Sequence, residues 1–579
     1  MTAVTDADGL AARVDPGSTV AIGGALFSRL PIGLIRRVAA RRVSGLHYVA
    51  WGGGLPLEMF LDADMISRLS FCFSSLDVFG MAPRFRAALE AGAIDATEWT
   101  ALGMIQALQA AGQNLPSASL QEPAGSDLRP HLTATDPASG ETVALARRMD
   151  IDTLLLHAQR ADTDGNIEIQ GVRGLDLSLI PAARQVLVTV EELVPCGSLG
   201  AARSVIISRH LVSAIAVMPD GAFPSSCLPY YAASYRAIRE LAEDPLRPTP
   251  AAEYLDRARS AARITPQAVE AALAARPAAE PGQVSTAELM MAWLAARYEP
   301  GSTCSAGAVS PLALGSYLLA KELTDPGPSI ITTSGGYWDI GPRPLLLGLG
   351  EVLDFASAPL HMGGDETYHQ LYQSGRIDYE VINVAQVDAR AATNNLWVTS
   401  PSGRTIRLPG QGGMADVADM HANFVLYQTR QSPLSLVEQV TQVSARRVLH
   451  ATADREASGY RPGNTALITN LAVFEPDEAT GRLRPVSLHP GVSAAQLRAA
   501  TGFAVDADGL PVTAAPEAAA LDLLRGRIDP LGLRDLEFVA ARDRTAVIQR
   551  VLAAEEQLID EVTDGPAPAP TKAQRSERG

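Results

Sequence analysis

Short apolar runs rich in β-branched residues alternate with amphipathic, Ala- and Leu-rich stretches over residues 1 to about 240. The short runs predict buried strands, and apolar residues at helical spacing predict helices that cover a sheet. Strands that alternate with helices in this way favour a parallel sheet with crossover connections, so we predict an α/β fold. The expected strands are Thr19–Ile22, Leu46–Trp51, Leu69–Phe73, Thr153–Leu156, Gln185–Val190 and Ala214–Val217.

The opening of this pattern occurs twice. "DPGSTVAIGGALFSRLPIGLIRRVA" begins at Asp15 and "EPGSTCSAGAVSPLALGSYLLAKEL" begins at Glu299, so that the two PGST motifs lie 284 residues apart. Each copy leads into a second apolar strand that ends in glycines, "LHYVAWGGG" and "SIITTSGG". A period this long is typical of two copies of one domain rather than of a solenoid. We therefore predict two similar open α/β domains related by a pseudo-twofold axis, with a ligand site at their junction.

Composition divides the chain further. A Pro- and Ala-rich connector separates the two copies and contains apolar spacing typical of short helices at Tyr254–Ala262 and Val269–Ala275. The tail "DGPAPAPTKAQRSERG" is rich in Pro, Ala and charge, which predicts disorder. The expected boundaries are 1–242 for the first domain, 243–283 for the connector, 284–560 for the second domain and 561–579 for the tail.

Charge and cysteine content exclude several classes of protein. A net charge of -16 argues against nucleic acid as a partner, although small anions need only a local basic patch. No apolar run is long enough for a membrane span, and no signal peptide is recognisable, so we expect no membrane partner. The four cysteines form no CxxC pair, which makes a disulfide framework or a metal site unexpected and favours the cytoplasm.

Several motifs, in order, resemble the family I CoA-transferases of the glutaconate CoA-transferase branch. The first half is similar to an α subunit through "AIGGALFSRLPIGLIRRVA", "HAQRADTDGNIEIQG" and "VTVEELVP", and the second half to a β subunit through "NVAQVD" and "RLPGQGGMADVAD". The C-terminal "RPVSLHPGVSAAQLRAATGF" is also similar to the actinobacterial steroid-ring-opening CoA hydrolases. The resemblance implies fused α- and β-type subunits, a CoA thioester as substrate, no bound cofactor and a homo-oligomer, expected to be a dimer.

The resemblance also locates the transferase nucleophile, a glutamate that forms covalent acyl and CoA intermediates. In the family this residue ends the second strand of the β-type half, and the matching position here is Thr333 in "SIITTSGGYWD". A Thr hydroxyl cannot form the anhydride intermediate. The alternative is that the family position is matched to this sequence one or two residues away from the true one, but no Glu lies between Ser329 and Leu349.

Glycine-rich turns are the expected contacts for the acyl group and CoA. In "LPGQGGMADVAD", glycines allow backbone amides to approach a thioester oxygen closely, although a simple tight turn before a helix explains the same pattern. The turns after the other repeat strands are weaker candidates, because a lone Gly pair is common. The predicted binding residues are Gly23, Gly24, Gly53, Gly54, Gly335, Gly410, Gly412, Gly413 and Met414.

Few residues are candidates for acid–base chemistry. Glu98 matches a position where the resemblance to the ring-opening hydrolases implies a carboxylate near the acyl site, and partial burial would raise its pKa. A structural carboxylate at a helix N-terminus is the alternative. Glu351, Asp365 and Glu366 lie beyond Thr333 and could occupy the space of the missing nucleophile. Lone histidines such as His157, His361 and His369 are more often structural, and no metal site is predicted.

Three functions remain open on these observations. The first is an acyl-CoA enzyme that hydrolyses a thioester or a β-keto C–C bond, because the transferase glutamate is replaced. The second is a true CoA-transferase that uses a displaced carboxylate. The third is a CoA-binding protein without catalysis.

Overall fold

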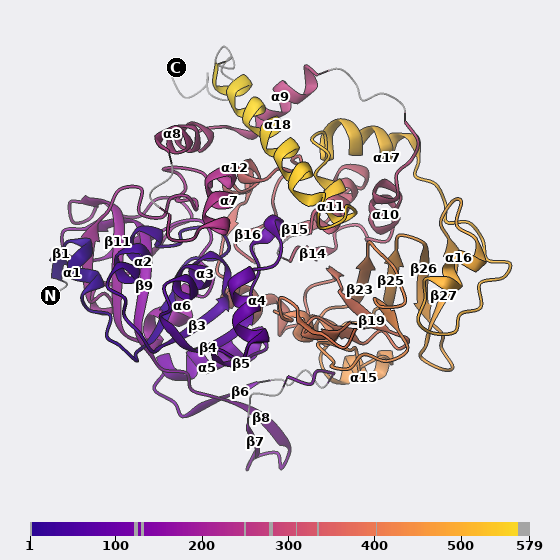
Figure 1. Ribbon diagram of the computed structural model, residues 1–579, viewed down its shortest axis with the longest axis horizontal. Coiled ribbons are helices and arrows are strands. Elements are labelled where there is room, and N and C mark those ends of the chain that lie inside the picture. The colour runs from indigo at the N-terminus through magenta and orange to yellow at the C-terminus, as the bar shows by residue number, and fades with distance from the viewer. Residues whose placement is uncertain are drawn as a thin grey trace.

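The computed structural model describes residues 3–120, 125–128, 132–247, 251–276, 282–307, 310–332, 335–400 and 402–564. Figure 1 shows two bodies side by side, an indigo-to-magenta N-terminal half and an orange C-terminal half, with the yellow C-terminal helix above their junction. Each half is built around one large sheet with helices packed on it. None of the described helices is both long and apolar enough to span a bilayer.

The N-terminal half contains a mostly parallel sheet, as the alternation of strands and helices predicts. All six predicted strands are present, and Thr19–Ile22 and Ala214–Val217 have the predicted limits. Two short strands, β10 (Ile167–Ile169) and β12 (Val205–Ile207), add an antiparallel extension beside β9 (Ile151–Asp162). The main order is β1 (Ala3–Thr5), β13 (Ala214–Val217), β11 (Ala183–Val194), β9 (Ile151–Asp162), β2 (Thr19–Ile22), β3 (Leu46–Gly52), β4 (Ile66–Phe73) and β5 (Asp95–Glu98).

The C-terminal half repeats the centre of this sheet and changes its edges. In both halves, the strand that follows the PGST motif lies between the next strand in sequence and a later parallel strand. In the first half β2 lies between β3 and β9, and in the second half β14 (Thr303–Ser305) lies between β15 (Ser329–Thr332) and β18 (Tyr379–Asn383). Antiparallel strands form the edges of the second sheet. Its order is β17 (Leu360–His361), β16 (Tyr337–Trp338), β15 (Ser329–Thr332), β14 (Thr303–Ser305), β18 (Tyr379–Asn383), β23 (Asn423–Gln428), β25 (Thr465–Thr469), β26 (Ala472–Pro476) and β27 (Leu483–Leu488). The shared strand order confirms the predicted repeat, while the pseudo-twofold axis and the homodimer stay predictions.

Local sequence signals start the helices that cover the sheets. Thr100 caps α5 by accepting a hydrogen bond from the Gly103 amide, and Ser285 with Glu288 forms a capping box at α10. The helices of the N-terminal half are α1 (Ala7–Ala11), α2 (Ile32–Ala40), α3 (Gly54–Asp62), α4 (Pro83–Glu90), α5 (Ala101–Gly112), α6 (Asp176–Ala182) and α7 (Tyr235–Glu243). Those of the C-terminal half are α10 (Thr286–Ala295), α11 (Pro311–Leu323), α12 (Gly348–Ser357), α13 (Gly364–Thr367), α14 (Met414–Met420), α15 (Thr452–Ala457), α16 (Ala494–Ala499), α17 (Ala518–Leu523) and α18 (Arg544–Asp564).

Three small sheets complete the architecture. One of them, in the N-terminal half, projects from the lower edge of the view in Figure 1. The other two lie in the C-terminal half. Their strands are β6 (Ser117–Leu120), β7 (Leu132–Thr135) and β8 (Thr142–Arg147); β19 (Gln386–Asp388), β20 (Thr393–Asn394) and β24 (Leu436–Val437); and β21 (Trp397–Thr399) with β22 (Thr405–Arg407).

The connector forms the two predicted helices, α8 (Ala252–Ala261) and α9 (Pro266–Ala274). Each is linked to α18 by an ion pair, Arg257 with Asp560 and Arg276 with Glu561. α18 continues to Asp564, past the expected domain end at residue 560, because the helical pattern runs on into the segment assigned to the tail. Residues 565–579 lie outside the described residues, and the domain boundaries stay predictions.

Candidate active site

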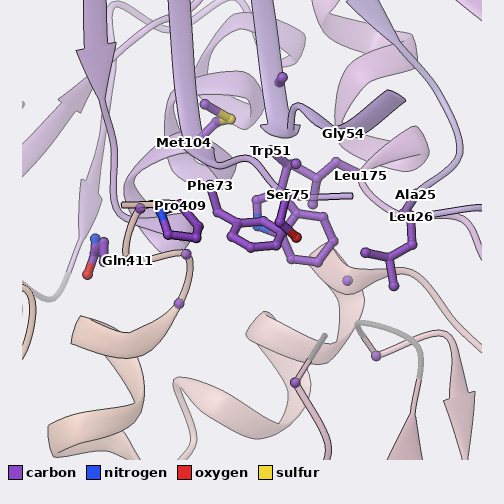
Figure 2. A pocket seen from close by; sticks show the side chains of 18 of the residues that line it. Ala25, Leu26, Trp51, Gly54, Phe73, Ser75, Met104, Leu175, Pro409 and Gln411 are labelled. Carbon is purple, nitrogen blue, oxygen red and sulfur yellow. The ribbon is translucent and has the colours of Figure 1, made fainter. Parts of the chain in front are cut away.

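A cavity of about 290 Å³ lies between the two halves, where the repeat predicted a ligand site. Figure 2 shows strands of the N-terminal half ending above it and the C-terminal half closing it from below. In open α/β sheets, ligands bind at the loops that follow the carboxyl ends of the parallel strands. The first half contributes the ends of β2, β3 and β4, and the second half contributes β14, β18 and the glycine-rich segment before α14.

The walls of this junction cavity are mainly apolar. Trp51, Phe73, Met104 and Leu175 form part of the wall in Figure 2. Among the described residues that line the cavity there is no Lys, Arg or His. Carboxylates enter it from both halves, Asp77 and Glu380. The cavity therefore favours an apolar ligand group and offers acid–base groups without a fixed positive charge.

The glycine-rich segment lines the cavity, and two of its glycine amides already have hydrogen-bond acceptors. Gly410, Gly412, Gly413 and Met414 all line the cavity. The Gly410 amide donates to the Asn395 carbonyl at 3.0 Å, and the Gly412 amide donates to the Cys72 carbonyl at 3.0 Å. Within the described part of the chain, the Gly413 amide has no acceptor. It is thus a free backbone donor in this segment, and the side-chain Nε2 of Gln411, which also lines the cavity, is a second donor without a partner.

Gly413 is also tightly packed. A Cβ atom built at this position would lie 1.9 Å from the hydroxyl oxygen of Tyr368, a residue of the helical turn Tyr368–Tyr372. Real Cβ atoms do not approach oxygen this closely, so that any other residue would displace the turn or the loop. The absence of a side chain at Gly413 therefore leaves the space that the Tyr368 hydroxyl occupies beside it at the cavity wall.

Glu98 anchors the glycine-rich segment from the other half. Its carboxylate lies 2.6 Å from a guanidinium nitrogen of Arg407 and accepts a hydrogen bond from the Gln411 amide at 3.1 Å. Burial raises the pKa of Glu98, whereas the charge of Arg407 and its hydrogen bond lower it. The Arg407 guanidinium itself is packed near the rings of Phe71, Phe85 and Trp397. Glu98 does not line the cavity, so the predicted general base occupies a buried ion pair that positions the loop.

Glu380 is the residue that sequence reasoning missed. It lies on β18, lines the cavity, and keeps 13% of its side chain exposed. The Tyr372 hydroxyl donates to one carboxylate oxygen at 2.6 Å and is itself 2.7 Å from the Ser305 hydroxyl. Burial raises the pKa of Glu380 to about 7, against the hydrogen bonds from Tyr372 and Ser305 that lower it. The signal in the sequence was a single Glu within the apolar strand "YEVIN".

A second buried carboxyl lies close to Glu380. Asp416 on α14 accepts a hydrogen bond from the Leu102 amide of α5 at 3.2 Å, and its other oxygen has no partner among the described residues. Burial raises the pKa of Asp416 to about 7, and the Leu102 hydrogen bond opposes this shift. His421 lies 3.9 Å from the Glu380 carboxylate, and burial lowers its pKa well below the ordinary value. Glu380 and Asp416 therefore exchange protons near neutral pH, whereas His421 is neutral there.

Asp77 faces the cavity from the N-terminal half. Its φ angle of 56° places a non-glycine residue in the left-handed region, which is uncommon and concentrates at functional sites. Burial raises the pKa of Asp77 to about 6, against the Val78 amide and the charge of Arg544 that lower it.

The remaining predicted binding positions divide into two groups. Gly24, Gly54 and Gly335 line the cavity, and their contact with an acyl group or CoA stays a prediction. Gly23 and Gly53 do not line it, because they pack against neighbouring side chains: an added Cβ would lie 2.3 Å from Leu156 at Gly23 and 2.7 Å from Leu57 at Gly53. Close packing therefore explains why a glycine occupies each of these two positions.

Thr333 lies outside the described residues, and the three carboxylates considered as its substitutes all have structural partners. Glu351 accepts hydrogen bonds from Ser28 and Ser226 at 2.7 Å each. Asp365 accepts from the amide and hydroxyl of Ser178, and Glu366 pairs with Arg173 at 2.7 Å. In each case the partner comes from the first half, so these residues hold the halves together.

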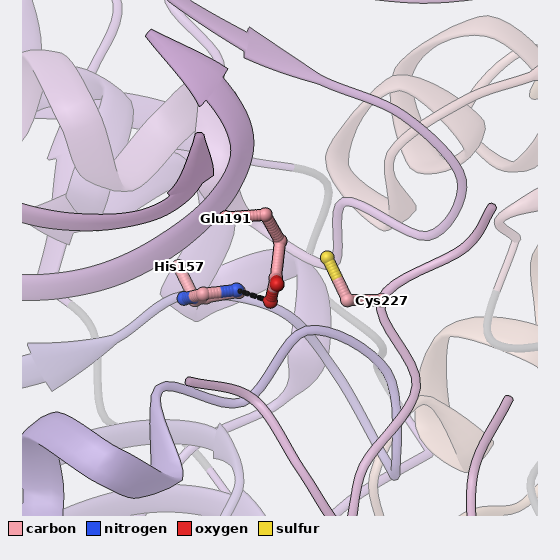
Figure 3. Close-up of side chains that lie close together, drawn as sticks. All are labelled: His157, Glu191 and Cys227. Atoms are coloured by element: carbon pink, nitrogen blue, oxygen red, sulfur yellow. Dashed lines mark hydrogen bonds and ion pairs between the residues drawn. The ribbon is translucent and has the colours of Figure 1, made fainter. Parts of the chain in front are cut away.

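The histidines singled out in the sequence have hydrogen-bonded, structural surroundings. His361 is close to the Phe355 carbonyl and His369 to Gln373. Figure 3 shows His157, Glu191 and Cys227 close together, as a metal site would require. However, His157 already bonds Thr189 and Glu191 at 2.8 Å each. Burial also raises the pKa of the Cys227 thiol well above its ordinary value, so that it stays protonated and is a poor metal ligand. His157 and Glu191 therefore belong to a buried hydrogen-bond network in the core.

Comparison with known proteins agrees with this architecture. A family model described as Coenzyme A transferase matches residues 4–216. The chain is 31% identical over 247 residues to one subunit of the 3-oxoadipate CoA-transferase of Pseudomonas knackmussii, an alignment that covers 42% of this chain and 92% of the relative. It is 29% identical over 256 residues to the cholesterol ring-cleaving hydrolase IpdA subunit of Mycobacterium tuberculosis, covering 41% of this chain and 87% of that protein.

One solved structure covers both halves. The acyl-CoA transferase YdiF of Escherichia coli O157:H7 matches with a TM-score of 0.64 and 14% identity, over 89% of this chain and 95% of that one. At this identity the match shows a shared fold.

Proposed function

Because the chain belongs to the coenzyme A transferase family, we propose that it is an enzyme that binds an acyl-CoA thioester in the junction cavity and hydrolyses it. The bond cleaved is the thioester or a C–C bond β to it. One observation carries this proposal: Glu380 lines the cavity with a pKa raised by burial to about 7. A group that exchanges its proton near neutral pH is suited to general base catalysis.

In this proposal Glu380 takes a proton from water, and the resulting hydroxide attacks the carbonyl carbon of the thioester or of the β-keto group. The tetrahedral intermediate then collapses with cleavage of the C–S or C–C bond, and Glu380 returns its proton to the departing sulfur or carbon. The hydrogen bond from Tyr372 fixes the carboxylate at the cavity wall. Negative charge develops on the carbonyl oxygen, and in this proposal the Gly413 amide stabilises it by donating a hydrogen bond. Glu98 acts indirectly by holding the loop that carries this amide.

A transferase is the second candidate, and the same residue favours it. Glu380 is a carboxylate within the cavity, so it could attack the thioester itself in place of the glutamate that Thr333 replaces in the sequence. Two observations support hydrolysis over transfer. The second strand carries no Glu at the family position, and the Tyr372 hydrogen bond occupies a Glu380 oxygen.

The walls of the cavity indicate the class of acyl group. An ionised second carboxylate on the acyl group would find no cationic side chain among the described lining residues and would meet Asp77 and Glu380. Burying such a charge without a partner is costly. We therefore expect an apolar acyl group, with Trp51, Phe73 and Leu175 as part of its binding surface.

The experiment is a comparison of CoA thioesters with and without an acceptor acid. For the hydrolase we expect free thiol from an alicyclic or aromatic acyl-CoA, or a ring-opened acyl-CoA product from a cyclic β-keto acyl-CoA, at a rate independent of added acetate. After borohydride treatment of the acyl-CoA-treated enzyme, mass spectrometry should find no reduced glutamyl adduct. An adduct on Glu380 together with acetate-dependent exchange would establish the transferase instead.

A further inference from the structure

One tyrosine on the wall of the junction cavity has a fixed ring and takes no part in the chemistry described so far. Tyr368 begins the helical turn Tyr368–Tyr372 and lines the cavity beside Gly413. Its ring centroid lies 4.4 Å from that of Tyr372, and its ring meets that of Trp51 edge-on, with centroids 6.5 Å apart. Tyr368 is only 5% exposed, so these neighbours hold its ring in one orientation.

The two adjacent tyrosines of this turn differ in what their hydroxyl groups contact. The Tyr372 hydroxyl donates to the Glu380 carboxylate at 2.6 Å. The Tyr368 hydroxyl has no such partner within the described residues, and its oxygen keeps accessible surface at the cavity wall. The Nε2 atom of Gln411 also lacks a partner there, but it is fully buried, so a ligand reaches it only after the wall moves. Tyr368 therefore offers a donor to a ligand without any movement of the wall.

The Tyr368 hydroxyl and the Gly413 amide are close enough to bind one oxygen atom together. A Cβ atom built on Gly413 would lie 1.9 Å from the hydroxyl oxygen. Because the bonds to a Cα atom are about 1.5 Å long, this oxygen lies within about 5 Å of the Gly413 nitrogen. Two donors that each approach one acceptor at about 2.9 Å are at most about 6 Å apart. The pair therefore satisfies the distance condition for a shared acceptor.

The surroundings of Tyr368 keep the proton on its phenol oxygen. Burial raises the pKa of Tyr368 well above its ordinary value. The neighbouring Asp416, Tyr372 and Glu380 raise this pKa further. A protonated phenol donates a hydrogen bond, and such a donor stabilises negative charge on a ligand oxygen without giving up its proton.

We propose that Tyr368 is a catalytic residue of the junction cavity, and that its hydroxyl donates to the carbonyl oxygen of the acyl-CoA together with the Gly413 amide. The inference rests on the proposed function, because it takes this carbonyl as the reacting group. The hydrogen bond strengthens as the oxygen gains negative charge in the tetrahedral intermediate, and the phenol proton stays on Tyr368 throughout. Such a donor raises the rate more than it strengthens substrate binding.

Tyr368→Phe tests the assignment, because it removes the hydroxyl and keeps the ring. Its kcat for the acyl-CoA should fall about 10²–10³-fold, as when one donor to an oxyanion is removed, while KM stays unchanged. The rise of kcat with pH should remain centred at about 7, since Glu380 is intact. Tyr298→Phe is the matched control and should keep the wild-type kcat. Tyr298 is also 5% exposed, but its hydroxyl lies 2.6 Å from that of Ser316, away from the cavity lining.

Binding of a tetrahedral analogue gives a second measurement that does not depend on turnover. The trifluoromethyl ketone thioether of CoA forms a hydrate that resembles the tetrahedral intermediate. Calorimetry should show that Tyr368→Phe binds this analogue about tenfold more weakly than wild type does, while both proteins bind CoA equally. An equal loss of affinity for the analogue and for CoA would indicate a structural role and overturn the proposal, as would unchanged affinity for both.

Two outcomes separate this inference from the hydrolase proposal. If wild type transfers CoA through an adduct on Glu380 and Tyr368→Phe slows that transfer, the hydrolase proposal fails and the donor assignment stands, because both reactions place negative charge on the same oxygen. If wild type hydrolyses the acyl-CoA and Tyr368→Phe does so at the same rate, the donor assignment fails and the hydrolase proposal stands.

Discussion

The carboxylate of Glu98, at the end of β5, lies 2.6 Å from the guanidinium of Arg407, a residue of the other half. Their side chains are only 9% and 2% exposed. The pair is therefore a buried ionic link across the junction, directly behind the segment that carries the Gly413 amide.

Glu98→Gln should destabilise the protein strongly. Removal of one partner leaves the other charge buried and uncompensated, which costs about 3–5 kcal/mol. Urea unfolding should show this loss, with Glu438→Gln as control. That residue pairs with Arg482 while 59% exposed, and such pairs contribute about 0–1 kcal/mol. The general base role predicted from the sequence has a different signature: turnover lost at unchanged stability.

Glu380→Gln should abolish most of the turnover and leave CoA binding intact. Loss of a general base lowers the rate by about 10²–10⁴-fold, because Gln keeps the shape but cannot take a proton. In wild type, kcat should rise with pH through about 7, as the carboxylate becomes ionised. Full turnover in the Gln variant would transfer the role to Asp77 or Asp416.

The same substitution should stabilise the fold at alkaline pH. The pKa of Glu380 rises from the ordinary 4.5 to about 7 on folding, so the folded state holds a proton that the unfolded state releases. Stability from this group is present below pH 4.5 and is lost as pH rises through about 7. The ionised carboxylate then costs on the order of 3 kcal/mol, and Gln removes that cost. Urea midpoints at pH 5 and pH 8 should show a difference between variant and wild type that grows with pH.

Thr333→Glu should create covalent chemistry. A Glu at the family position is able to form the acyl anhydride and then the glutamyl-CoA thioester, neither of which Thr can form. Borohydride reduction and peptide mass spectrometry should detect an adduct at position 333 in this variant, and Thr333→Gln serves as its control. Acetate-dependent CoA exchange by the wild-type enzyme at a similar rate would contradict the interpretation of Thr333 as a lost nucleophile.

Gly413→Ala should damage both fold and activity. The new methyl group would lie 1.9 Å from the Tyr368 hydroxyl oxygen, and such overpacking costs about 1–3 kcal/mol. The displaced amide should also lower kcat more than it raises KM, because it acts on the transition state. Gly526→Ala is the control, since no atom lies within 4 Å of its added Cβ. Wild-type kcat in Gly413→Ala would exclude this amide as the oxyanion donor.

The strands and the repeat could be predicted from the sequence because both depend on local information. Apolar periodicity set the limits of Thr19–Ile22 and Ala214–Val217, and the two PGST motifs located equivalent central strands. The glycine-rich segment was also visible, since a glycine's conformational freedom belongs to the residue itself. These features require no knowledge of which distant residues meet.

The chemistry of the site was decided by contacts between residues far apart in the chain. Glu98 and Arg407 are separated by 309 residues, and their ion pair assigns Glu98 to the loop rather than to the cavity. The raised pKa of Glu380 arises from its burial in the folded protein, which outweighs the hydrogen bonds from Tyr372 and Ser305 that lower it. A pKa depends on desolvation and neighbouring charges, which exist only once both halves have folded against each other. The sequence by itself determined the strands, the repeat and the glycine loop, and the tertiary structure alone determined which carboxylates line the cavity.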